Sequence, residues 1–163
     1  NMLDDNLIPL LTQKLDRYQL PARCLVFDIK ESMLDRNLIR TKYILQSLKS
    51  MGCEIHLDNF GVGKSSFNGL IDYPVDAIKI DQALIDFNTN SAQCQKIIEG
   101  LIRFSNTIGI RCIAEGVETE AQYEILRASG CHIIQGYLIG KPVAADDPRS
   151  AITALKTVRE ITQ

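Results

Sequence analysis

Hydrophilic side chains stand at or near the ends of five short apolar runs that otherwise have the composition of buried β-strands. The runs cover residues 24–29, 53–58, 76–80, 110–115 and 132–136, and the side chains are Asp28, Asp58, Lys79, Glu115 and Gln135. Carboxylate oxygens are the ligands that Mg2+ and Mn2+ prefer, and a lysine beside such ions would stabilise developing negative charge. Each residue also has an ordinary interpretation, with Asp58 as a turn residue and Lys79 as a solvated strand end. Chemistry therefore requires that the fold bring these side chains together.

Helical and strand-like segments alternate along the chain. Apolar residues recur at helical spacing in residues 7–18, 38–51, 97–108, 123–126 and 152–161, with a terminal helix expected over 150–162. Three joints repeat the order helix, glycine, strand, polar residue, and their glycines suit the left-handed position after a helix: Gly52, Gly109 and Gly130. The alternation predicts βα repetition with a parallel sheet.

The strand-end side chains favour a barrel over an open sheet. In a parallel α/β barrel the carboxyl ends of all strands lie on one face, where catalytic residues gather. An open doubly wound sheet could bring some of these residues to a crevice, but five from five strands less naturally. We therefore predict that the five side chains converge on the mouth of a TIM-like (β/α) barrel.

Composition narrows the class of protein. The chain has 163 residues, 45% apolar and 23% charged, which predicts one soluble globular domain without a membrane segment or a signal sequence. A formal net charge of -2 argues against a nucleic-acid duplex as partner. The cysteines form no CxxC pair, so we expect buried, reduced thiols in a cytoplasmic protein: Cys24, Cys53, Cys94, Cys112 and Cys131. His56 and His132 are interpreted as strand residues beside the core.

Four blocks between about residues 20 and 142 carry a family resemblance. "FDIKES", "LDNFGVGKSSFNGLIDYPVDAIKID", "IAEGVETEAQYEILRASGC" and "QGYLIGKP" follow one another in the order of the signature blocks of the EAL domain. The chain thus resembles the bacterial cyclic-di-GMP phosphodiesterases. This resemblance implies a TIM-like barrel whose first strand is antiparallel to the others, and hydrolysis of cyclic di-GMP to linear pGpG with Mg2+ or Mn2+.

The resemblance also implies roles for individual residues. It makes Lys79 and Glu115 catalytic, with the lysine orienting the attacking water, and it makes Gln135 part of the inner ligand-binding shell. Metal ligands are implied at Asp28, Asp58, Asn59 and Glu115. Glu31 and Glu118 are implied to support catalytic loops, although Glu118 can also be read as an acid at a helix start with Thr119 near the cap. Gly61 and Gly63 would permit the tight loop behind Asp58 and Asn59.

Two positions depart from the family pattern. Asp28 replaces a longer glutamate, and Asn59 is neutral where a second carboxylate is expected, which should weaken the second metal. The "EAL" block and the asparagine of the following strand are expected upstream of the matched region, so residues 1–163 are read as a partial EAL domain with about the last five βα units. We expect weak Mg2+ or Mn2+ binding, poor cyclic-di-GMP binding and no turnover in this chain.

Two functions remain open at this point. The first is a degenerate EAL module that binds cyclic di-GMP or a protein partner without turnover, which Asp28 and Asn59 favour. The second is an active metal-dependent phosphodiesterase in the full-length protein. Expected partners are cyclic di-GMP, a second copy of the chain pairing with exposed sheet edges, and upstream GGDEF, PAS or receiver domains.

Overall fold

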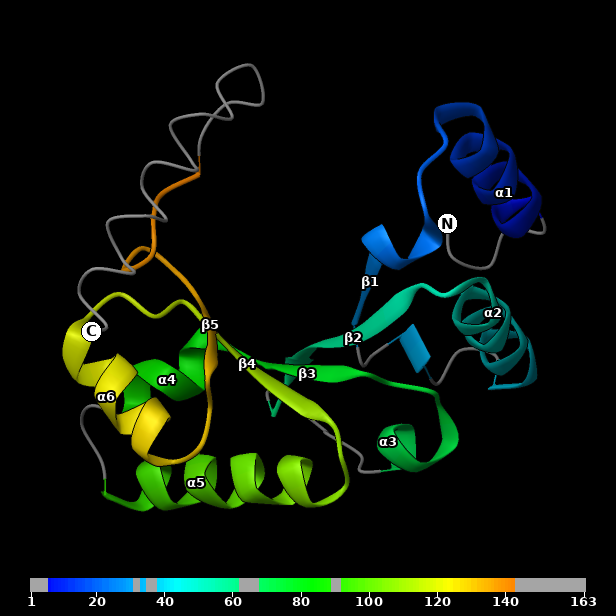
Figure 1. Cartoon of the computed structure of the whole chain (residues 1–163). Helices are drawn as coiled ribbons and strands as arrows, with labels where there is room; N and C mark the ends of the chain where they lie inside the picture. The colour runs from blue at the N-terminus through cyan, green and yellow to red at the C-terminus, as the bar shows by residue number, and fades with distance from the viewer. Residues whose placement is uncertain (1–5, 31–32, 35–37, 62–67, 89–91, 143–163) are drawn as a thin grey trace. The chain divides into compact units, whose positions relative to one another are not determined.

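The structure is a computed structural model that describes residues 6–30, 33–34, 38–61, 68–88 and 92–142 (Figure 1). Its strands are β1 (Val26–Lys30), β2 (Glu54–Phe60), β3 (Ala77–Ile80), β4 (Arg111–Glu115) and β5 (Ile133–Gln135). They form one sheet in the order β1-β2-β3-β4-β5, and parallel pairing joins β1 to β2 and β4 to β5. The predicted α/β fold with a parallel sheet is confirmed.

The chain divides into two compact units, which are described separately. Unit 1 comprises Asn1–Lys79 with Ile108–Arg111, and unit 2 comprises Ile80–Thr107 with Cys112–Gln163. The helices of unit 1 are α1 (Leu7–Tyr18), the 3-10 turn η1 (Ala22–Cys24), α2 (Leu38–Met51) and α3 (Asn68–Asp72). Those of unit 2 are α4 (Gln82–Asn88), α5 (Ala92–Thr107) and α6 (Glu120–Ala128).

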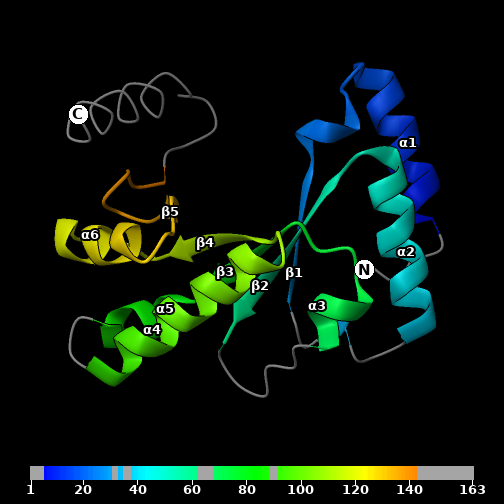
Figure 2. The same cartoon turned by 60° about the horizontal axis from the view of Figure 1, so that its bottom comes forward.

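In unit 1, α2 covers β2 and lies beside α1 (Figures 1 and 2). Leu45 and Leu48 of α2 are fully buried, as are Ile55 and Leu57 of β2. Gly52 ends the helix with a φ of +97°, a backbone conformation that costs glycine little. The apolar face of α2 therefore packs on the strand that follows it in sequence.

Asp76 joins three elements of unit 1 at the start of β3. Its Oδ1 lies 2.6 Å from Lys49 Nζ of α2, and its Oδ2 accepts a hydrogen bond from the backbone N–H of Ile55 at 2.8 Å. The N–H of Asp76 in turn donates to the carbonyl of Ile55 at 2.8 Å. These bonds fix where β3 begins beside β2, and thereby place Lys79 three residues later.

In unit 2, α5 supplies the largest buried helix face and contacts α4. Ile98, Ile102 and Ser105 of α5 are buried, as are Cys112 and Ala114 of β4. The Nδ2 of Asn106 at the end of α5 donates to the carbonyl of Gly130 at 3.3 Å. This bond links α5 to the turn between α6 and β5.

Most predicted elements are present, with shifted ends. The helices predicted over 7–18 and 38–51 match α1 and α2, whereas α5 begins at Ala92 rather than at residue 97. β1 begins at Val26 rather than at residue 24, because residues 22–24 form a turn in which the Cys24 N–H donates to Pro21. The helix predicted over 150–162 lies outside the described residues.

The expectation for the cysteines is confirmed in part. All five thiols are free, and Cys53, Cys112 and Cys131 are buried. Cys24 is exposed and Cys94 is only half-buried, so their predicted burial was wrong. For Cys24 the reason is that η1 places it outside the sheet. In the described part of the chain, no helix combines the length and apolar character needed to cross a bilayer.

Candidate functional site

A polar row crosses the first three strands of unit 1. Asp28 of β1 is the register partner of His56 of β2, and the Nζ of Lys79 in β3 donates to Asp28 Oδ2 at 3.1 Å. The Nδ1 of His56 lies 3.7 Å from Asp28 Oδ1. Because Lys79 reaches Asp28 across the intervening strand, the three side chains share one face of the sheet. The side chain of Lys79 is 9% exposed and that of Asp28 is 50% exposed, so the cation is the more buried partner.

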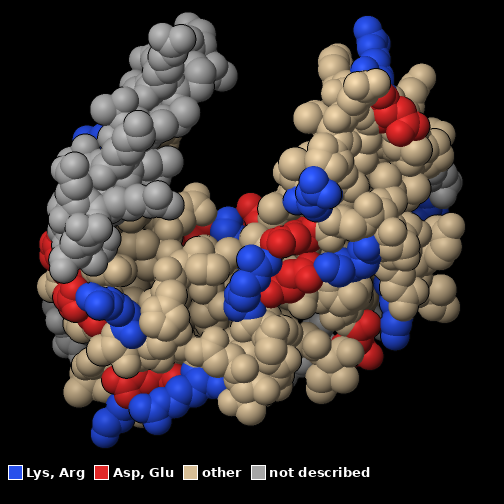
Figure 3. All heavy atoms as spheres, in the orientation of Figure 1, with Lys and Arg blue, Asp and Glu red and all other residues tan. Residues whose placement is uncertain are grey.

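The row continues through Glu54 to Arg111. The Nε2 of His56 lies 3.2 Å from Glu54 Oε2, and the Nη2 of Arg111 donates to the same oxygen. The hydrogen bond from Arg111, followed by that with His56, lowers the pKa of the Glu54 carboxyl. We call Asp28, Glu54, His56, Lys79 and Arg111 the charged row. Figure 3 shows acidic and basic side chains interspersed, in keeping with this pairing of opposite charges.

Asp58 and Asn59 stand near the end of β2. Asp58 pairs in register with Lys30, and its Oδ1 accepts a hydrogen bond from the Asn59 N–H at 2.9 Å. Asn59 has a φ of +59°, a left-handed conformation that asparagine and aspartate tolerate better than most residues. Gly61 follows with a φ of +90°. The strand therefore ends in a tight turn, as predicted, whereas Gly63 lies outside the described residues.

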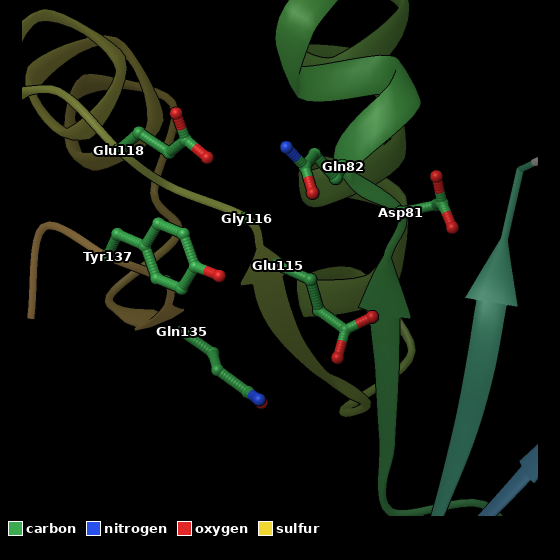
Figure 4. Close-up of a pocket in the computed structure, with 8 residues that line it drawn as sticks. Asp81, Gln82, Glu115, Gly116, Glu118, Gln135 and Tyr137 are labelled. Carbon is green, nitrogen blue, oxygen red and sulfur yellow. The ribbon is translucent and has the colours of Figure 1, made fainter. Parts of the chain in front are cut away.

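Unit 2 contains a polar pocket at the ends of β4 and β5. It has a volume of about 540 Å3 and is lined by Asp81, Gln82, Glu115, Gly116, Glu118, Gln135, Gly136 and Tyr137. Glu115 and Gln135 are register partners and the last residues of their strands. In Figure 4 their side chains project in the same direction, and the phenol oxygen of Tyr137 points toward Glu115. We call this the strand-end pocket.

Backbone contacts hold the wall of the strand-end pocket. The Val117 N–H donates to the carbonyl of Gln135 at 3.1 Å, and the Leu138 N–H donates to the carbonyl of Val117 at 3.0 Å. A Cβ at Gly136 would overlap the backbone of Val117, so only glycine permits this approach. The loop after β5 is thereby fixed against the loop after β4.

The start of α6 fixes Glu118 on the same wall. Gln122 Oε1 accepts hydrogen bonds from the N–H groups of Glu118 at 2.8 Å and Thr119 at 3.0 Å, and Thr119 Oγ1 accepts from the Gln122 N–H at 3.3 Å. This reciprocal capping box confirms Thr119 as the cap. Within the described part of the chain, the Glu118 carboxylate makes no hydrogen bond or ion pair. Its support of a catalytic loop stays a prediction.

Cys112 and Cys131 are free, buried thiols of unit 2. Burial raises the pKa of Cys112 to about 11 and also raises the pKa of Cys131. The Sγ of Cys131 donates to the carbonyl of Ile133 at 3.4 Å. Both thiols are protonated at neutral pH and behave as small apolar groups.

The described residues supply the right kind of donor for Mg2+ or Mn2+ but too few together. No group of three His, Cys, Asp or Glu residues is arranged to hold an ion within the described ranges. In unit 1, Asp28 Oδ2 accepts from Lys79 and Asp58 Oδ1 accepts from a backbone N–H. Carboxylate oxygens are suitable ligands for Mg2+ and Mn2+, but the described residues alone do not bring enough of them together to form a metal site.

The structure thus gathers the predicted residues into two groups. Asp28 and Lys79 meet in unit 1, and Glu115, Glu118 and Gln135 line one pocket in unit 2. Convergence of all of them on a single mouth stays a prediction, and Glu31 lies outside the described residues.

Sequence reasoning missed several polar residues beside these groups. They are Glu54, His56, Asp81, Gln82, Arg111 and Tyr137. A register between β1 and β2 would have placed His56 beside Asp28, and the position of Tyr137 two residues after Gln135 was a usable signal. The prediction of His132 as a strand residue beside the core was wrong, because it is exposed and precedes β5.

Comparison with known proteins identifies a matching family. Residues 1–142 match the family model described as the EAL domain. The signaling protein YkoW of Bacillus subtilis is 37% identical over 138 residues, which make up 85% of this chain and 17% of YkoW. The chain spans about a fifth of the length of the curated relatives it matches.

Two solved structures illustrate the likeness of fold. The PaMucR phosphodiesterase in its c-di-GMP complex aligns with a TM-score of 0.83 and 32% identity, covering 90% of this chain and 60% of that chain. The manganese/cy-diGMP complex of Klebsiella pneumoniae BlrP1 aligns with a TM-score of 0.79 and 26% identity, covering 85% and 36%. This chain thus covers less than two thirds of each of the two solved chains.

Proposed function

Because this chain belongs to the EAL domain family, we propose that it is a cyclic-di-GMP signalling domain that binds the dinucleotide with little or no turnover. The PaMucR phosphodiesterase and BlrP1 are each solved with the same dinucleotide, and both share the fold of this chain. We place the protein in the cytoplasm, where cyclic di-GMP would reach it.

The strand-end pocket is the observation that carries the binding proposal. Its volume of about 540 Å3 is within the usual range for small-molecule sites. Glu115 and Gln135 lie side by side at the carboxyl ends of parallel strands, where α/β folds bind ligands. A carboxylate and an amide together offer acceptors and donors for ribose and base edges.

Weak turnover is proposed from Asp28 and Asn59. The Asp28 carboxylate already accepts a hydrogen bond from Lys79, and Asn59 brings no charge where a second carboxylate would attract a cation. When bound, two hard cations would activate water and neutralise the phosphate, which contributes several kcal/mol to lowering the barrier. Each loss of about 1.4 kcal/mol slows such a reaction tenfold.

An active phosphodiesterase is the second candidate. Lys79 as a whole residue is 7% exposed, and Glu115 and Gln135 line the strand-end pocket. The fold therefore positions three of the residues implied for hydrolysis. Lys79 would stabilise negative charge on the phosphate, and Glu115 would accept a proton from water.

The deciding experiment combines binding with product analysis on the whole protein. Calorimetry with cyclic di-GMP measures binding, and chromatography detects pGpG in the presence of Mn2+. We expect binding, little pGpG, and an increase of roughly tenfold or more in turnover when Asp28→Glu is combined with Asn59→Asp. Gln93→Glu, which adds the same single charge at an exposed position of α5, is the control and should not raise turnover.

Three results would count against the proposal. Brisk pGpG formation by the unmodified protein would establish the second candidate. No gain in the double variant would show that Asp28 and Asn59 do not limit turnover. No heat with cyclic di-GMP would remove the binding proposal.

A further inference from the structure

Tyr137 is a large exposed aromatic side chain in a pocket that is otherwise polar. It is 58% exposed and lines the strand-end pocket together with Glu115 and Gln135. Figure 4 shows the ring standing over the side of the pocket with its oxygen toward Glu115. An aromatic ring left open beside hydrogen-bonding groups is suited to contact a flat ligand.

The backbone is anchored on both sides of Tyr137. Gly136 contacts the backbone of Val117 with no space for a Cβ, and the following Leu138 N–H donates to Val117. Tyr137 therefore lies between two residues anchored on the same partner. These contacts fix the backbone position from which the Tyr137 side chain extends.

A tight turn then brings a cation onto the ring. The N–H groups of Ile139 and Gly140 both donate to the carbonyl of Gly136, at 3.0 Å and 3.3 Å. Lys141 follows, and its Nζ lies 5.7 Å from the centroid of the Tyr137 ring, within the range of a cation–π contact. The ammonium thus occupies one side of the ring and places a positive charge at the border of a pocket that contains three carboxylates.

We propose that Tyr137 is a stacking platform for one guanine base of cyclic di-GMP, and that Lys141 adds a positive charge for the oxygens of the same nucleotide. The inference rests on the proposed function, and it deepens that proposal by naming the residue that recognises the base. Proteins commonly bind unpaired nucleobases by stacking them on aromatic side chains. The carboxylates, Gln82 and Gln135 then remain for the polar parts of the ligand.

Tyr18 provides a matched control within the same chain. It is 60% exposed, and the guanidinium of Arg17 lies 5.7 Å from its ring centroid. The two tyrosines therefore match in exposure and in their cation contact, but Tyr18 lies on α1 and does not line the strand-end pocket. If removing the ring weakens ligand binding at Tyr137 but not at Tyr18, the loss is due to the location of Tyr137 in the strand-end pocket.

The test compares cyclic-di-GMP affinities of the whole protein and three variants by calorimetry. Tyr137→Leu should raise Kd roughly tenfold or more, because stacking is lost. Tyr137→Phe should remain within about twofold, since the ring is kept, and Tyr18→Leu should leave Kd unchanged. Protein containing 3-fluorotyrosine gives an independent readout, with the Tyr137 fluorine signal assigned by its loss in Tyr137→Phe. That signal should shift on adding cyclic di-GMP, whereas the Tyr18 signal should not.

The outcomes separate this inference from the proposed function. Binding by the unmodified protein, with an unmoved Tyr137 signal and an unchanged Kd in Tyr137→Leu, would overturn the inference alone. An equal loss of affinity in Tyr18→Leu would also overturn it. No binding by the unmodified protein would overturn the proposed function and this inference together.

Discussion

The charged row and the strand-end pocket are both built on parallel strands, but they differ in how their charges are compensated. In the charged row, Asp28 has Lys79 as partner and Glu54 has Arg111. In the strand-end pocket, no lysine or arginine is among the lining residues, and Glu118 makes no ion pair within the described part of the chain.

This difference indicates different roles for the two regions. Paired charges neutralise one another, so the sheet face can carry the charged row at a moderate cost in desolvation free energy. The strand-end pocket gathers three carboxylates with no lysine or arginine among its lining residues, so it concentrates negative potential that a cation can relieve. We therefore assign the charged row mainly to positioning and the strand-end pocket mainly to binding.

The largest expected effect comes from the wall of the strand-end pocket. Gly136→Ala places a Cβ on the backbone of Val117 and should lower the free energy of unfolding by about 3 kcal/mol. Gly100→Ala is the control, because nothing lies within 4 Å of its added Cβ in α5, and it should stabilise by about 0.5–1 kcal/mol. Urea unfolding measures both. Equal stability of Gly136→Ala and the unmodified protein would show that the loop is not held as described.

A smaller effect tests the pairing in the charged row. Asp28→Asn removes the carboxylate that pairs with Lys79, whose side chain is 9% exposed, and should lower the free energy of unfolding by about 2 kcal/mol. Lys79→Met should cost less, because the half-exposed Asp28 can be hydrated instead. The comparison is made by urea unfolding at neutral pH and moderate salt. A larger cost for Lys79→Met would reverse the assignment of the buried partner.

The outer pair of the charged row should contribute less than 1 kcal/mol, because Arg111 and Glu54 are partly exposed and screened by solvent. The pKa of Glu54 is lowered in the folded state, chiefly by Arg111. Its stabilising contribution is therefore present above the ordinary glutamate pKa and is lost as pH falls through the folded value. We expect Arg111→Met to be less stable than the unmodified protein at pH 6, with a difference that shrinks as pH falls below the ordinary glutamate range. A difference that does not change with pH would point to packing instead of charge.

The smallest effect has the opposite sign. Glu118→Gln removes a carboxylate without an ion pair from the strand-end pocket and should stabilise the protein by up to about 0.5 kcal/mol. The gain should shrink at high salt, where repulsion is screened. Thermal unfolding at two salt concentrations measures it. If Glu118→Gln destabilises the protein as Asp28→Asn does, the contrast between the two regions fails.

Much of the fold could be predicted because strong periodicity marks it. The bounds of α1 and α2 follow from apolar spacing, and α2 ends at Gly52 as expected. The short helices α3 and α4 were not predicted, because helices of 5 and 7 residues have too few turns to show a helical repeat of apolar residues. The β1 boundary was missed because η1 is a local turn that apolar composition does not reveal.

The site could be predicted where each residue ends a strand. Glu115 and Gln135 are adjacent for that reason. His56 was missed because its role depends on the register between β1 and β2, which local sequence does not determine. The Arg111 contact with Glu54 joins residues 57 positions apart and required the tertiary structure.

The capping box of α6 restricts how a phosphate could be held near Glu118. Free N–H groups at a helix start commonly bind anions. Here the amides of Glu118, Thr119 and Gln122 all donate within the chain, and Glu120 adds a negative charge in the first turn. Three amides near this helix start are thus already engaged and the Glu120 carboxylate opposes an anion, so a counter-cation would help to hold a phosphodiester at this wall. Ligand binding there should thus be coupled to the concentration of divalent ions.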